Sequence, residues 1–125
     1  MQMHAEAMAG AHPEVSSIVL DAIAQAYWSM GLPNAALPVA ERVLECYSAI
    51  PDIALEDTYD ARLRLAGLLR TVNRREEARV VFEETIREAK AAWGPDDPRV
   101  LKGQTLLAAL LLVSGDSRGA MELFE

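Results

Sequence analysis

The sequence is poor in the residue types on which metal-binding, disulfide-stapled and catalytic proteins rely. Its one cysteine, Cys46, excludes an internal disulfide and favours a reducing compartment, so we expect a cytoplasmic protein. We interpret Cys46 as a small buried hydrophobic residue. Its two histidines, His4 and His12, are not at metal-ligand spacing from a cysteine or carboxylate, and no glycine-rich phosphate loop occurs. The sequence therefore predicts no metal site, no cofactor and no enzymatic activity.

Long apolar runs and an excess of positive charge are missing as well. The longest apolar run, residues 106–113, has eight residues, whereas a membrane-spanning helix needs about 20. The formal net charge is −7 at pH 7, and nucleic-acid binding requires clustered lysine and arginine. We therefore expect neither a membrane span nor a nucleic-acid partner.

The composition favours a packed helical domain. Hydrophobic residues make up 51% of the chain and aromatic residues 6%, a balance that suits helices better than sheets. Charge is unevenly placed, because residues 1–57 hold eight acids and one base while residues 58–125 hold eleven of each. We interpret this asymmetry as solvated surface, with end-to-end association as the alternative.

Small residues and turn residues recur along the chain at a spacing of 42 positions. The three series are Ala24, Ala66 and Ala108; Ala36, Ala78 and Ala120; and Gly31, Asn73 and Gly115. A small residue lets two helices cross closely, and glycine or asparagine accepts the left-handed conformation that ends a helix. A fixed period of this kind indicates stacked repeats. The sequence therefore predicts an all-α fold, an α-solenoid of antiparallel helix pairs.

Proline, glycine and aspartate set the expected helix boundaries. We expect helices over residues 13–30, 33–48, 58–72, 75–93 and 98–113, followed by a sixth that begins after residue 116. Asp57, at the end of the loop 51–57, is predicted to cap the third helix. Residues 13–125 then form a single domain with repeats at about 13–50, 55–93 and 97–125, the last one incomplete. Residues 1–12 are a leader, either disordered or forming a short extra helical turn.

With this pattern in place, the chain resembles the tetratricopeptide repeat family. The small residue of each first helix is followed three positions later by a larger one, at Tyr27, Leu69 and Leu111. The linker GPDDPRV at residues 94–100, with HPEV at 12–15, resembles the longer variant found in kinesin light chains and bacterial regulators. The resemblance implies a right-handed superhelix of about 2.5 to 3 repeats that binds a protein or peptide partner.

Two features of the family's peptide-binding members are missing. The positions of the paired asparagines in the first helices are held by other residues, and Lys102 alone stands in a plausible place for a carboxylate clamp. The positions are Asp21-Ala22, Leu63-Arg64 and Thr105-Leu106. A partner held by its carboxyl terminus is therefore not expected.

The family resemblance and the repeat register predict the residues of the inner groove. They are Asp21, Gln25, Trp28, Leu63, Gly67, Arg70, Thr105, Ala109 and Leu112. Trp28, Arg70 and Leu112 occupy equivalent positions, and a tryptophan beside an arginine can form a cation–π contact in a binding site. The alternative is that Trp28 packs against residues 1–12 or a neighbouring helix.

The carboxyl-terminal repeat has an extra apolar stripe. Where the second repeat has Arg64, Gly67 and Arg70, the third has Leu106, Ala109 and Leu112. We expect an open-end apolar surface made of Leu106, Leu112, Met121, Leu123 and Phe124. Either the natural protein continues into further repeats, or this end pairs with another copy as a homo-oligomer.

Three functions remain open at this point. The leading hypothesis is a scaffold for protein–protein interaction that binds a peptide, a helix or a subunit within a larger regulatory protein. The alternative is a self-assembling adaptor that forms dimers or filaments by end-to-end stacking. A sensor for a small ligand is less favoured, since three repeats scarcely form a deep pocket.

Overall fold

Prolines and glycines set the helix boundaries in the computed structural model, which describes residues 12–123. Along this part of the chain the helices are α2 (Pro13–Ser29), α3 (Pro33–Ser48), α4 (Leu55–Thr71), α5 (Arg75–Trp93), α6 (Pro98–Val113) and α7 (Ser117–Glu122). Three of them begin with proline at the first helical position, as predicted. The predicted leader up to residue 11, and Phe124 of the expected open end, lie outside the described residues.

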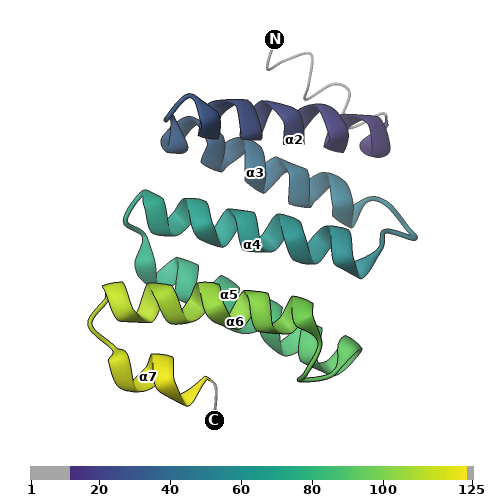
Figure 1. Ribbon diagram of the computed structural model, residues 1–125. Coiled ribbons are helices and arrows are strands. Elements are labelled where there is room, and N and C mark those ends of the chain that lie inside the picture. The colour runs from purple at the N-terminus through teal and green to yellow at the C-terminus, as the bar shows by residue number, and fades with distance from the viewer. Residues whose placement is uncertain (1–11, 124–125) are drawn as a thin grey trace.

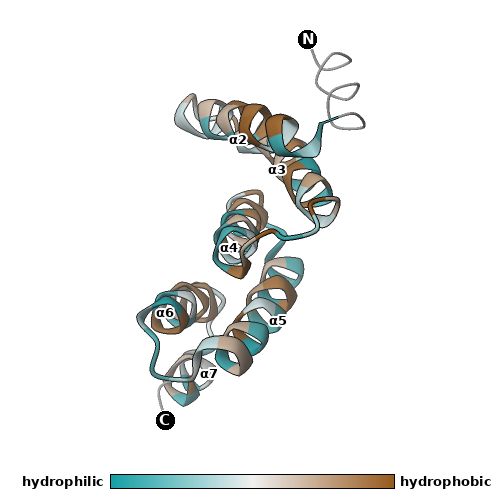
Figure 2. Ribbon diagram, turned by 90° about the vertical axis from the view of Figure 1, so that its right-hand side faces the viewer, coloured by the Kyte–Doolittle hydropathy of each residue, from teal (hydrophilic) through white to brown (hydrophobic). Residues whose placement is uncertain are grey.

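The helices stack in chain order as antiparallel pairs. Each one packs on the next, from α2 on α3 through to α6 on α7 (Figure 1). Figure 2 shows α4 and α6 on one side of the stack and α5 on the other. An all-helical repeat solenoid is thus confirmed.

The recurring alanines lie where helices pack. All six are buried, and Ala36, Ala66 and Ala78 have no solvent exposure. Five belong to the main core, while Ala24 packs with residues of α2 and α3 in a smaller amino-terminal core that also includes Ala61 of α4. Larger side chains at these positions would force neighbouring helices apart.

The predicted turns are found, with one correction at the start of α4. Asn73 has a φ of 67°, so it takes the left-handed conformation expected of it. Asp57 is not the N-cap of α4, because the helix begins two residues earlier and Ala54 precedes its first residue. The backbone N–H groups of Asp57 and Thr58 already donate to the carbonyl of Ala54. Asp57 instead lies in the first turn, where its negative charge interacts favourably with the helix dipole.

The junction between α5 and α6 is fixed by stacked and hydrogen-bonded side chains. Gly94 has a φ of 92°, and Asp97 caps α6 by accepting a hydrogen bond from the backbone N–H of Arg99 at 2.9 Å. The Arg99 guanidinium lies 3.7 Å from the centre of the Trp93 ring and also pairs with Asp97. These contacts with Arg99 hold the pKa of the Asp97 carboxyl below its usual value.

Tyr59 of α4 ties this junction to the core. Its hydroxyl donates to the backbone carbonyl of Arg99 at 2.6 Å, and its ring meets Trp93 edge to face at 5.1 Å. Burial raises the pKa of this tyrosine. Gly103 leaves the space that the hydroxyl needs, because a Cβ built there would overlap it. We call Tyr59, Trp93, Asp97 and Arg99 the junction cluster.

The first junction, between α3 and α4, has no equivalent of this cluster. The residues 42 positions before Trp93 and Arg99 are Pro51 and Asp57, which cannot form an arginine–tryptophan stack. The α2–α3 pair is therefore held to α4 chiefly by the packing of α3 on α4.

The carboxyl-terminal end is more closed than the sequence suggested. Leu106 and Leu123 are half-buried against the main core, and the buried Gln104 side chain donates to the carbonyl of Leu123 at 3.3 Å. Leu112 and Met121 remain exposed, at 57% and 68%. Of the predicted open-end surface, only these last two side chains are exposed within the described residues.

Candidate functional site

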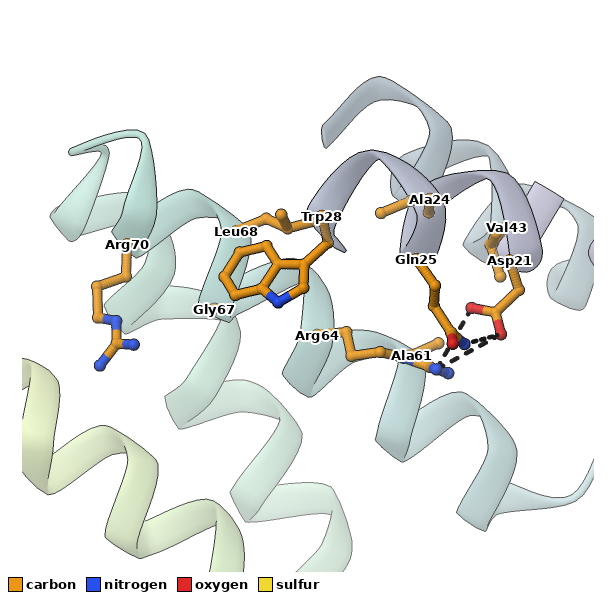
Figure 3. Close-up of a pocket in the computed structure, with 11 residues that line it drawn as sticks. Asp21, Ala24, Gln25, Trp28, Val43, Ala61, Arg64, Gly67, Leu68 and Arg70 are labelled. Atoms are coloured by element: carbon orange, nitrogen blue, oxygen red, sulfur yellow. Dashed lines mark hydrogen bonds and ion pairs between the residues drawn. The ribbon is translucent and has the colours of Figure 1, made fainter. Parts of the chain in front are cut away.

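A cavity of about 280 Å³ lies between α2 and α4. Its walls come from these two helices, and Ala40 and Val43 of α3 contribute to its apolar lining. The lining residues are Asp21, Ala24, Gln25, Trp28, Ala40, Val43, Ala61, Arg64, Gly67, Leu68 and Arg70 (Figure 3). Because α2 and α4 each pack mainly on α3, this space stays open between them. We call it the α2–α4 cavity.

Helical spacing places the wall residues on single faces. On α2, Asp21, Gln25 and Trp28 are four and three residues apart and so share one face. On α4, Arg64 and Gly67 share a face for the same reason, with Leu68 beside them. The polar side chains that line the cavity therefore come from α2 and α4, and the apolar lining lies between them.

One end of the cavity is closed by a polar bridge. The Asp21 carboxylate accepts from the Gln25 amide at 2.8 Å and from the Arg64 guanidinium at 3.4 Å (Figure 3). Both partners of the ion pair are partly exposed, so it contributes at most about 1 kcal/mol to stability. This bridge joins α2 directly to α4 and neutralises the charge of Arg64.

Gly67 leaves open space in the middle of the α4 wall. A Cβ built on Gly67 would meet no atom within 4 Å, so no neighbour in the chain requires a glycine there. A glycine in a helix interior costs about 0.5–1 kcal/mol relative to alanine. Gly103 differs, since a Cβ there would overlap the buried Tyr59 hydroxyl and lie 3.1 Å from Ile86. Packing thus explains Gly103 but not Gly67.

Trp28 and Arg70 lie at the other end of the cavity without stacking on each other. The Trp28 side chain is 50% exposed, and its indole stands near the stretch of α4 that carries Gly67 and Leu68 (Figure 3). The cation–π contact that an arginine beside Trp28 could make is not formed by Arg70 among the described residues, where Arg99 stacks on Trp93 instead. Repeat register makes the two positions equivalent, but the cavity separates their helices. The alternative packing of Trp28 on residues 1–11 falls outside the described part.

The structure brings five of the nine predicted groove residues to this cavity: Asp21, Gln25, Trp28, Gly67 and Arg70. Leu63 does not join them, because it is buried in the main core and its neighbour Arg64 lines the cavity instead. Thr105, Ala109 and Leu112 lie on α6 and do not line the cavity either.

Sequence reasoning missed the apolar lining. Ala24, Ala61 and Leu68 fit the core pattern of their helices, and Ala40 and Val43 belong to a second helix, which was not expected to reach the groove. The one available signal was the small size of the three alanines, which leaves room beside them.

The residues that line the cavity include no histidine, cysteine or serine. Among residues 12–123, no three histidine, cysteine, aspartate or glutamate side chains gather closely enough to hold a metal ion. Cys46 is buried and lies outside the cavity lining, and burial raises the pKa of its thiol. Across the same residues, no helix has the length and apolar character to span a membrane.

Comparison with known families identifies one segment of this chain. Residues 58–99, from the first turn of α4 into the first turn of α6, match the model of the tetratricopeptide repeat. This match confirms the family resemblance seen in the sequence. Comparison with curated proteins found no match.

Gly67 and Gly103 should respond in opposite ways to substitution by alanine. Gly67→Ala should raise the free energy of unfolding by about 0.5–1 kcal/mol, because it improves helix propensity in open space. Gly103→Ala should lower it by about 1–3 kcal/mol through overlap with Tyr59. Urea unfolding followed by circular dichroism measures the free energy of unfolding of both variants. A destabilised Gly67→Ala variant would mean that the chain itself needs this glycine.

Proposed function

We propose that this chain, which contains a tetratricopeptide repeat, is a non-enzymatic protein-interaction module that binds a segment of another protein in the α2–α4 cavity. Tetratricopeptide repeats generally mediate protein–protein interaction. The buried cysteine supports a cytoplasmic location, and a larger regulatory protein is the setting we favour.

The observation that carries the proposal is the unfilled space over Gly67. A helix-weakening glycine that no internal contact requires, facing an apolar cavity, is explained if another molecule approaches there. Trp28 supports this, since a half-exposed tryptophan on a cavity wall is typical of binding hot spots.

The open form of the cavity favours a protein segment over a small molecule. Pockets for small ligands usually measure about 300–1,000 Å³ and enclose most of the ligand. This cavity, at about 280 Å³ and open along the groove, suits one or two side chains of a partner whose remainder stays outside. A small-ligand sensor is therefore the less favoured function.

Substitution of Trp28 tests the proposed site. Peptides selected on the wild-type chain from a phage-displayed random library should bind Trp28→Ala at least about tenfold more weakly, because a hot-spot side chain contributes about 2 kcal/mol or more. Isothermal titration calorimetry measures the affinity.

The matched control is Leu112→Ala, the equivalent position on α6, which is exposed but outside the cavity. Binding to this variant should be unchanged. Peptides that instead lose affinity for Leu112→Ala and keep it for Trp28→Ala would move the site to α6 and refute the proposal.

End-to-end assembly is a second candidate function, favoured by exposed apolar side chains at both ends of the stack. On α2, Ile18 is 71% exposed and Val15 is 50% exposed. At the other end, Leu112 and Met121 are similarly exposed. Apolar surfaces at opposite ends of a repeat stack can pair head to tail between copies.

Light scattering coupled to size-exclusion chromatography tests this assembly. The molar mass should rise with concentration, and Ile18→Glu or Met121→Glu should each return it to the monomer value by burying a charge at the contact. Val80→Glu, on the exposed outer face of α5, serves as the control and should leave the mass unchanged. A wild-type chain that stays monomeric at high concentration rules assembly out.

A further inference from the structure

Arg70 is a half-buried cation at the cavity whose charge is not matched within the described residues. The arginines at positions 62, 64, 74, 79 and 99 each pair with a carboxylate, whereas Arg70 makes no ion pair in the described part of the chain. It lines the cavity beyond Trp28, at the opposite end from Asp21 (Figure 3). A guanidinium in this position offers a planar set of donors to an anion.

The two ends of the cavity differ in what they can accept. At one end the Asp21 carboxylate already occupies Arg64 and Gln25. At the other end Arg70 lines the cavity with no ion-pair partner among residues 12–123, and its side chain extends away from the Trp28 ring (Figure 3). An incoming anion therefore finds its partner at Arg70, one helical turn from the open space over Gly67.

We infer that the partner segment is acidic next to an apolar residue: its apolar side chain fills the space over Gly67, and its carboxylate pairs with Arg70. This inference rests on the proposed function. The apolar side chain would contact Ala24, Val43 and Leu68 of the cavity lining. A carboxylate fits better than a phosphate group, because phosphate sites gather several arginines and here one is available.

The net charge of the whole chain favours the opposite kind of peptide, so a preference for acidic peptides would be informative. At −7, the chain attracts basic peptides through its general field, most of all near the acidic residues 1–57. A preference for acidic peptides would run against that field. Such a preference would have to arise from a local contact.

A peptide pair and an arginine variant test the inference. Peptides selected from a phage-displayed random library on the wild-type chain should carry aspartate or glutamate at a fixed spacing from a large apolar residue. One selected peptide and its copy with glutamine in place of the acid are then titrated against wild type and Arg70→Gln. Wild type should prefer the acidic copy about tenfold, and Arg70→Gln should bind the two copies equally.

Two further variants serve as controls for this measurement. Arg70→Lys should retain part of the preference, because it keeps the charge and loses the planar donor set. Arg87→Gln, on the exposed face of α5, should retain all of it. Since the readout is a ratio of two affinities for one variant, a general loss of stability does not imitate the result.

The outcomes separate the two proposals. If peptides bind through Trp28 but lack acidic residues, or if Arg70→Gln keeps the preference, the acidic partner is wrong and the cavity remains the site. If binding is insensitive to Trp28→Ala, the cavity is not the binding site, and both the proposed function and this inference are wrong. A library that yields no binding peptide counts against both.

Discussion

Close approach of neighbouring helices at buried alanines is the constraint on which this structure depends. Ala36, Ala66 and Ala78 are fully enclosed, so the helices around them meet at a separation that larger side chains would not allow. Because the most extensive packing joins helices consecutive in the chain, α2 and α4 are held together mainly through α3. The cavity lies between these two helices, which are neighbours in the stack but pack mainly on α3.

The two inter-repeat junctions divide the molecule into differently supported parts. The junction cluster joins α4, α5 and α6 through stacking, an edge-to-face ring contact and a partly buried hydrogen bond. The first junction lacks such a cluster, and the exposed Arg64–Asp21 pair is a weak substitute. One wall of the cavity therefore comes from a helix that the junction cluster also joins to α5 and α6, and the other from a helix pair that has no such cluster.

Much of the fold could be predicted from the sequence because local rules govern it. The bounds of α3 and α5 and the left-handed turn at Asn73 follow from proline, glycine and asparagine chemistry. The site was harder to predict from the sequence, because its shape depends on how the helices are rotated and how far apart they lie. Repeat register grouped Asp21, Gln25 and Trp28, which line the cavity, but it could not show whether Leu63 or its neighbour Arg64 turns outward, nor that α3 lines the cavity.

Chemical-shift mapping tests most directly the central claim that partners enter the α2–α4 cavity over Gly67. A selected peptide titrated into the ¹⁵N-labelled chain should shift the Trp28 indole N–H and the Gly67 amide most strongly. Amides around Leu112 and Met121 should hardly move. If the largest shifts instead fall on α6 and α7, or if the Gly67 amide is unaffected by saturating peptide, the cavity is not the binding site.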